Sequence, residues 1–214
     1  MPTAEQNDLL GFFLCDEFGY NPDMRLVVGL GNPGSKYEET RHNVGFMWCD
    51  DLVRINHATF QDNGKFFSEV TRIGGSRSDV WILKPQTFMN ESGRAVSAFC
   101  RFYDIVPSEI MVVHDELDLS PGVVKIKKGG GHGGHNGLKD IAKAIGSDFW
   151  RLRIGIGHPG DKKMVSDFVL HRPTKEEGES LRGSFDRSLE LQENILVGEM
   201  DAAMLKLHSS NPKH

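Results

Sequence analysis

Residues 123–146 read VVKIKKGGGHGGHNGLKDIAKAIG and place a strand, a glycine-rich loop and a helix in immediate succession. The apolar run at 123–127 predicts a strand. Apolar residues at helical spacing over 138–145 predict a helix that Gly146 closes. A strand followed by a helix of this size is typical of a domain in which helices pack on a sheet.

The same alternation recurs on both sides of this stretch. Strands are predicted at 25–30, 66–73, 79–83, 109–113 and 150–156, helices at 42–56 and 92–103, and two more helices from about residue 174. This order predicts a single α/β domain with a twisted, mostly parallel or mixed sheet, helices on both faces and a C-terminal helical tail. Residues 1–23 show no helical or strand period, so we expect a poorly ordered N-terminal extension before a domain at 24–214.

Composition limits the class of protein. The 214 residues are 38% hydrophobic, which allows one core, and no apolar run is long enough to span a bilayer. We therefore expect a soluble cytoplasmic protein. Cys15, Cys49 and Cys100 lie far apart and form neither a metal-ligand spacing nor a disulfide framework, so buried reduced thiols are predicted for Cys49 and Cys100.

Charge is distributed unevenly. The net charge is −5, yet residues 123–153 hold seven basic and two acidic side chains, a local charge of +5. Such a patch can guide an anionic substrate to an acidic protein. Lys125 and Lys127 share one face of their strand while Lys128 points the other way, and Arg153 joins the first two if its strand is the neighbour.

The glycine loop at 129–137 admits two interpretations. Successive exposed backbone N–H groups in a tight loop form a concavity for anions, and glycine allows a ligand to approach closely. The alternative is a flexible surface connection, although long glycine loops in compact domains are usually functional or disordered.

Several familiar patterns are poor guides in this chain. GxGxxG occurs three times, and in the first copy Pro33 interrupts the loop, no helix follows directly, and Asp50 falls on a helix, which argues against a dinucleotide site. His132 and His135 form an HxxH on the glycine loop, where spacing does not fix metal geometry. No GxSxG elbow is present. We expect no metal, no cofactor and no covalent nucleophile.

The remaining polar residues follow predicted strands or begin predicted helices. A histidine such as His42 can take a proton from water, and an aspartate such as Asp115 can fix its tautomer. Asparagine amides stabilise a developing oxyanion without titrating. The candidates are Asn32, Asn90 and Asn136.

Each candidate also has a purely structural interpretation. His42 stands at a helix start, Asp115 can cap a turn with Asp118, and Asn90 and Asn136 are ordinary N-cap residues. These residues alone therefore leave two possibilities open, a hydrolase or an anion-binding α/β protein.

Five segments of the chain resemble, in order, the motifs of bacterial-type peptidyl-tRNA hydrolases. They are VVGLGNPGSKYEETRHNVGF, KPQTFMNESG, VVHDELDL, GGGHGGHNGLKDI and RLRIGIGHPG, and they extend over about residues 24–172. The helical tail has no distinctive motif, and residues 1–23 fall outside the match.

The resemblance implies hydrolysis of the ester between a peptide and the 3′ ribose of tRNA. It assigns the catalytic base to His42 and its partner to Asp115, with Asn32 completing the catalytic set, and it implies no metal. Asn32 and Asn90 hold the peptide and the 3′-terminal region, and Asn136 positions water or the substrate backbone. The cleft is lined by Tyr37, Phe88 and Met89, and tRNA phosphate meets Lys125, Lys127 and Arg153.

The resulting hypothesis is a monomeric esterase that acts on peptidyl-tRNA, without a stable protein partner and without a membrane. The alternatives are a non-catalytic RNA-binding module that uses the same basic loop, and a metal-dependent amidohydrolase.

Overall fold

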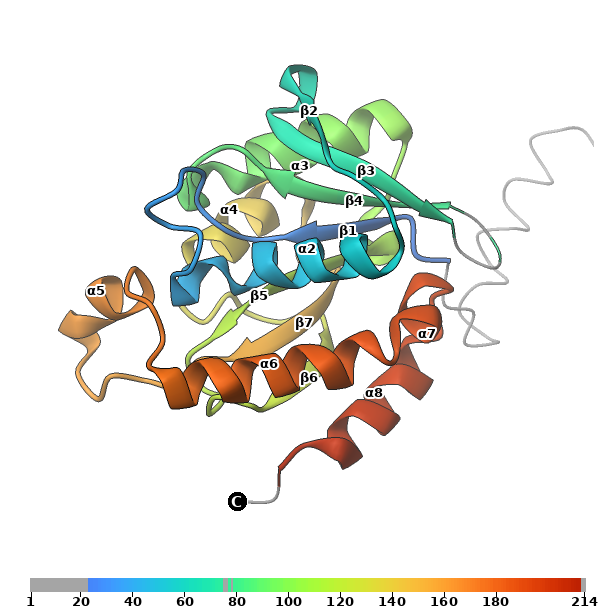
Figure 1. Ribbon diagram of the computed structural model, residues 1–214. Coiled ribbons are helices and arrows are strands. Elements are labelled where there is room, and N and C mark those ends of the chain that lie inside the picture. Colours follow the sequence, from blue (N-terminus) through green and yellow to red (C-terminus); the bar gives the residue numbers. More distant parts are fainter. Residues whose placement is uncertain (1–22, 75–76, 78, 213–214) are drawn as a thin grey trace, which may run out of the picture.

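A computed structural model describes residues 23–74, 77 and 79–212. Apart from Asp23, the predicted N-terminal extension lies outside the described residues. The centre of the fold is a seven-stranded sheet in the order β2-β3-β4-β1-β5-β7-β6 (Figure 1). Its strands are β1 (Leu26–Gly29), β2 (Gln61–Asn63), β3 (Ser68–Gly74), β4 (Asp79–Pro85), β5 (Ile110–Glu116), β6 (Val124–Lys128) and β7 (Trp150–Gly155).

The sheet is mixed, as predicted. β1 runs parallel to β4 and to β5, and β5 runs parallel to β7. The outer pairs β2–β3, β3–β4 and β6–β7 are antiparallel. The carboxyl ends of β4, β1, β5 and β7 therefore meet at one edge, which is where ligands bind in sheets of this kind.

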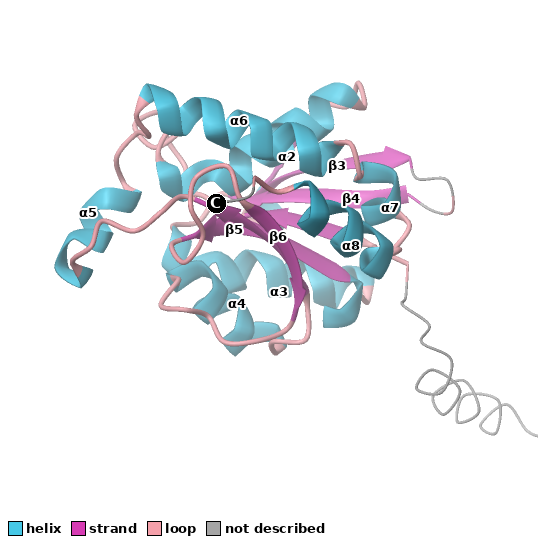
Figure 2. Ribbon diagram, turned by 90° about the horizontal axis from the view of Figure 1, so that it is seen from below, coloured by secondary structure: helices cyan, strands magenta, loops and turns pink. Residues whose placement is uncertain are grey.

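Helices cover both faces of the sheet (Figure 2). On one face, apolar side chains of α2, α6 and α8 join those of the strands in a single core cluster. On the other face, α3 and α4 form a second cluster. The helices are α2 (Val44–Ile55), α3 (Ser92–Tyr103), α4 (Asn136–Ile145), α5 (Val165–Val169), α6 (Lys175–Leu189), α7 (Gln192–Leu196) and α8 (Met200–Ser210).

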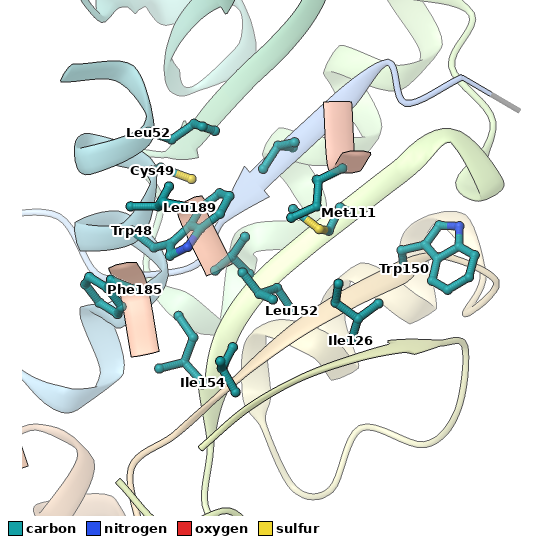
Figure 3. Close-up of a cluster of buried hydrophobic side chains, with 14 of the residues drawn as sticks. Trp48, Cys49, Leu52, Met111, Ile126, Trp150, Leu152, Ile154, Phe185 and Leu189 are labelled. Carbon is teal, nitrogen blue, oxygen red and sulfur yellow. The ribbon is translucent and has the colours of Figure 1, made fainter. Parts of the chain in front are cut away.

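The first cluster joins α2 to α6 above the central strands. Figure 3 shows Trp48 of α2 directed toward the central strands, and Phe185 of α6 and Leu152 of β7 belong to the same buried cluster. The buried Trp48 indole donates through Nε1 to Ser188 Oγ at 2.8 Å, so burial leaves it no unsatisfied polar group. Gly45 is the second residue of α2 and packs directly against the backbone that follows β1. A Cβ atom at this position would lie 2.4 Å from the Leu30 backbone nitrogen, so only glycine fits there.

The predicted segments differ from the observed ones mainly at their ends. β5 continues three residues beyond the predicted end, so Asp115 stands on a strand and not in a loop. β3 starts later than predicted because Phe67 adopts a left-handed backbone with φ of 52°. Strand β2 and helix α5 were not predicted, and the tail holds the additional short helix α7.

Two further expectations concern thiols and membrane spans. Cys49 and Cys100 are buried free thiols, as predicted, and burial raises the pKa of the Cys100 thiol to about 12. Among the described residues, no helix combines the length and apolar character needed to cross a bilayer.

Candidate active site

A cavity of about 490 Å³ opens at the carboxyl edge of the sheet. Three segments that follow or end the strands β1, β4 and β5 contribute to it, together with the glycine loop after β6 and one face of α5. Every residue that we assigned to catalysis or substrate binding lines this cavity: Asn32, Tyr37, His42, Phe88, Met89, Asn90, Asp115 and Asn136. The structure thus brings these predicted site residues together.

The centre of the cavity wall is the carboxylate of Asp115. Its Oδ1 lies 2.9 Å from Nδ1 of His42 and 2.9 Å from Nε2 of His135. His42 comes from the 3₁₀ turn before α2, and His135 from the residue before α4. Asp115 therefore does not act as a turn cap. That place is taken by Glu116, whose Oε1 accepts from the Asp118 backbone N–H at 3.2 Å.

The tautomer of His135 follows from its second contact. Its Nδ1 accepts hydrogen bonds from the backbone N–H groups of Gly137 at 3.2 Å and Leu138 at 3.3 Å, so His135 is the N-cap of α4. An acceptor nitrogen carries no proton, so in the neutral ring Nε2 must carry it. His135 therefore donates from Nε2 to Asp115. Asn136, which we had considered as an N-cap, is instead the first residue of α4.

The electrostatics of the pair favour a charged aspartate. Burial by itself would raise the pKa of Asp115, but His42 and His135 outweigh it and hold the pKa well below its usual value. Burial likewise lowers the pKa of His42, while the charge and hydrogen bond of Asp115 raise it, and the net shift is upward. A carboxylate acceptor also holds the proton of neutral His42 on Nδ1. Nε2 is then the basic nitrogen that remains for substrate.

His42, Asp115 and His135 are also spaced as metal ligands would be, with one ligand atom of each within 4.8 Å of the others. A metal among them would need a lone pair on Nε2 of His135. That nitrogen carries the proton as long as Nδ1 caps α4. His132, the other half of the HxxH, is exposed and its Nδ1 accepts from the Gly134 N–H at 3.1 Å. The donor set fits hydrogen bonding better than metal ligation.

Asn32 is held in one orientation by two partners. Its side-chain Oδ1 accepts from the Met89 N–H at 2.9 Å, which fixes the amide so that Nδ2 is the free donor. Asn43 clamps the Asn32 backbone from the other side. It accepts from the Asn32 N–H at 2.9 Å and donates to the Asn32 carbonyl at 2.9 Å. The cavity thus receives an N–H donor of known direction.

The predicted basic residues meet on one sheet face. Lys125 pairs in register with Arg153, and Lys127 with Arg151, so the four side chains share a face. Arg153 is partly neutralised because its Nε lies 2.9 Å from Glu116 Oε2. Lys127 is exposed and has no ion-pair partner among the described side chains. It is therefore the basic residue best placed to meet a phosphate.

Arg151, on the same strand as Arg153, binds the glycine loop. It is buried, and its guanidinium donates to the carbonyl oxygens of Gly131 at 2.6 Å and Gly130 at 2.5 Å. The glycine loop is thereby tied to the sheet, which does not fit the interpretation of a flexible connection. The loop ends at His135, so this anchor also helps to place the second histidine on Asp115.

Besides Arg151, three contributors were not predicted from the sequence. Asn43 lies in the TRHN segment, where only His42 stood out, and His135 was considered only as a metal ligand. Arg41 is the third. It donates to the backbone carbonyls of Phe168 and His171 at 3.2 Å and to Glu177 Oε2 at 2.6 Å, which holds α5 beside the cavity.

Comparison with known proteins agrees with this geometry. Residues 26–214 match the sequence profile of a family described as peptidyl-tRNA hydrolase. The chain belongs to the peptidyl-tRNA hydrolase family. The expectation drawn from the five motifs is therefore confirmed, and the match extends through the helical tail.

Relatives of this family resemble the chain over most of its length. A peptidyl-tRNA hydrolase of Nitrosomonas europaea is 53% identical over 187 residues, 87% of this chain and 96% of the relative. One from Neisseria meningitidis serogroup B is 51% identical over 187 residues, 87% of this chain and 97% of the relative. The crystal structure of peptidyl-tRNA hydrolase from Acinetobacter baumannii superposes with a TM-score of 0.87 at 44% identity, covering 91% of this chain and 99% of that one.

The contacts of His135 yield the first testable prediction. Replacing it in a His135→Ala variant removes the cap of α4 and one donor to Asp115. We expect about 1 kcal/mol less stability from the lost cap. The loss of a hydrogen bond to a charged group corresponds to about a tenfold lower kcat. Thermal unfolding and single-turnover kinetics measure the two effects.

The matched control is His132→Ala, three residues earlier on the same loop. His132 also lines the cavity, but among the described residues its imidazole bonds to the Gly134 N–H and forms no hydrogen bond to Asp115. We expect wild-type stability and kcat. Equal losses in both variants would contradict the bridging role of His135 and point to a general disturbance of the loop.

Proposed function

We propose that this chain hydrolyses the ester between the peptide and the 3′ ribose of peptidyl-tRNA. The observation that carries the proposal is the 2.9 Å contact between His42 Nδ1 and Asp115 Oδ1 at the wall of the cavity. It leaves Nε2 of His42 as a base beside a space large enough for an ester. The family of the chain supplies the class of substrate.

The reaction uses water as the nucleophile. Nε2 of His42 takes a proton from water while the oxygen attacks the ester carbonyl, and Asp115 stabilises the imidazolium that forms. The Nδ2 group of Asn32 donates to the substrate carbonyl, on which negative charge develops. The tetrahedral intermediate then expels the ribose 3′ oxygen, which takes the proton from His42. The products are a free peptide carboxylate and tRNA with a free 3′ hydroxyl.

The other cavity residues bind the substrate in this proposal. Asn90, in the 3₁₀ turn before α3, and Asn136, the first residue of α4, are exposed amides that hold the peptide and the 3′-terminal region. The cleft walls are formed by Tyr37, Phe88 and Met89. Lys125, Lys127 and Arg153 hold tRNA phosphate. We propose a cytoplasmic monomer that needs no metal, cofactor or stable protein partner.

Two other functions make different predictions. A non-catalytic RNA-binding module would bind tRNA and release no peptide from peptidyl-tRNA. A metal-dependent amidohydrolase would lose activity in EDTA. The tautomer of His135 disfavours the second, because its proton occupies the nitrogen that a metal would need.

The proposed mechanism predicts the result of removing the base or its partner. His42→Ala should lower kcat on peptidyl-tRNA by about 10²–10⁴-fold, and Asp115→Asn by a comparable factor, because the amide can present an N–H group to Nδ1. Turnover by His42→Ala at the wild-type rate would remove it from the mechanism. Circular dichroism and thermal unfolding check that the variants fold.

The pH profile of Asp115→Asn separates orientation from binding. In the wild type, Asp115 raises the pKa of His42 against the opposing effect of burial. The carboxamide removes that charge and leaves burial, so the pKa of His42 falls. We expect the acidic limb of the kcat/KM profile to move to lower pH while the maximum falls. An unmoved limb with only KM altered would make Asp115 a binding residue.

The basic face of β6 predicts a salt dependence. Lys127→Ala should raise KM for peptidyl-tRNA and lower the slope of log affinity against log salt by about one, since each phosphate contact releases counterions. Lys128→Ala is the matched control, because Lys128 is the adjacent exposed lysine on the opposite face of the strand. Identical slopes for both variants would rule out a specific phosphate contact at Lys127.

A further inference from the structure

An exposed patch of aromatic rings and cations lies outside the site described so far. It consists of Lys65, Phe67, Arg94 and Phe102, and we call it the aromatic–cation patch. The Arg94 guanidinium lies 3.9 Å from the Phe67 ring centroid, and the Lys65 ammonium 3.3 Å from that of Phe102. Phe67 is 37% exposed and Phe102 56%. Both cations therefore lie over rings that solvent still reaches.

Neither cation has a carboxylate partner in the part of the chain that the structure describes. No ion pair within the described residues includes Lys65 or Arg94, although fourteen such pairs occur there. Their N–H groups that do not face a ring are available to an acceptor on another molecule. A guanidinium stacked on a ring is held in place, so it loses little conformational freedom when it binds.

The backbone at Phe67 is strained. Its φ of 52° is the left-handed region, which a bulky residue adopts at a cost of about 1–3 kcal/mol. Strain of this size persists where surrounding structure enforces it, and here the Gln86 N–H donates to the Phe67 carbonyl at 2.7 Å. The result is an aromatic ring displayed at the surface instead of packed in the core.

The patch adjoins the catalytic cavity along the chain. Gln86, which holds Phe67, is two residues before Phe88, and Phe88 lines the cavity with 55% of its surface exposed. Asn90, another lining residue, lies in the 3₁₀ turn Met89–Glu91 that leads into α3, and Arg94 is the third residue of α3. We therefore expect a ligand that extends past Phe88 and Asn90 to reach Phe67 and Arg94.

The basic face and the aromatic–cation patch lie on opposite sides of the catalytic residues in the sheet order. In the sheet order, Asn32 follows β1 and Asp115 ends β5, and the basic face of β6 and β7 lies to one side of them. The patch lies to the other side, beyond β4, where α3 and β3 stand above the central strands in Figure 1. If phosphate is held on the β6–β7 side, the peptide extends toward the patch.

We propose that the aromatic–cation patch is a binding site for the peptide half of the substrate, several residues upstream of the ester. This proposal rests on the function proposed above. Peptide carbonyl oxygens accept hydrogen bonds from Arg94 and Lys65, and peptide side chains pack on the rings of Phe67 and Phe102. Neither contact depends on one peptide sequence, so the site recognises an extended chain of any composition.

Single-stranded RNA is the competing occupant, because nucleobases also stack on aromatic rings beside cations. The adjacency to Phe88 along the chain and the position opposite the basic face favour the peptide. An experiment separates the two by changing peptide length at constant RNA.

The test compares two substrates with the same tRNA and the same esterified amino acid. One carries a single acetylated residue, and the other a peptide of about six residues, which spans at most about 20 Å when extended. The variants are Arg94→Gln and Phe67→Asn, because asparagine tolerates the left-handed backbone. We expect KM for the longer substrate to rise about 3–10-fold, in line with aromatic contacts of about 0.5–1.5 kcal/mol. The short substrate should keep its KM and kcat.

The matched control is Arg72→Gln. Arg72 lies 4.9 Å over the Trp81 ring and pairs with Asp79 near the amino end of β4, away from the cavity. It should change neither substrate. Equal KM changes on the long and short substrates in the patch variants would overturn the proposal, as would no change on either.

A second readout does not use turnover. A free six-residue peptide amide should shift the NMR signals of Phe67 and Arg94 in the wild type and bind more weakly to Arg94→Gln. Shifts produced instead by deacylated tRNA, and lost in that variant, would assign the patch to RNA and refute the peptide site. Failure of the wild type to cleave even the short substrate would refute the enzymatic function. The NMR result would then still show whether the patch binds peptide, because it does not depend on turnover.

Discussion

One carboxylate oxygen, Oδ1 of Asp115, accepts from two imidazoles at 2.9 Å each, and the arrangement of the active site depends on it. Two donors keep a buried carboxylate ionised despite the cost of removing it from water. The same oxygen requires opposite tautomers, with the proton of His42 on Nδ1 and that of His135 on Nε2. Of the two histidines bound to Asp115, His42 is then the one that offers a basic nitrogen to the cavity.

The fold brings the three residues together from distant parts of the chain. Asp115 ends the central strand β5, the turn before α2 places His42 above it, and the first turn of α4 places His135 beside it. Backbone N–H groups in the first turn of α4 donate to Nδ1 of His135 and fix its ring. The orientation of α4 therefore determines where Nε2 of His135 meets the Asp115 carboxylate. Arg151 secures the glycine loop that leads into this turn. The loop that first suggested an anion site thus also acts as a structural support for the catalytic pair.

Sequence patterns predicted the α/β class and the sheet with helices on both faces, because long apolar segments determine those elements. They also indicated that polar residues such as Asp115 gather where strand ends converge at one edge. The family resemblance was needed to assign their roles, and it alone pointed to Tyr37, Phe88 and Met89. The sequence did not predict which distant residues would contact one another. Nothing local shows that Nδ1 of His135 caps a helix while Nε2 meets a residue twenty positions away, or that Arg151 turns toward glycine carbonyls. The left-handed backbone at Phe67 likewise depends on a contact from Gln86.

The most direct measurement of the shared carboxylate is ¹⁵N NMR of the histidine rings at neutral or slightly alkaline pH. The structure predicts a proton on Nδ1 of His42 and on Nε2 of His135, each with a downfield ¹H shift from its hydrogen bond to Asp115. Asp115→Asn should abolish both downfield signals. A proton on Nε2 of His42, or on Nδ1 of neutral His135, would contradict the account. The base would then point away from substrate, or the cap of α4 would be broken.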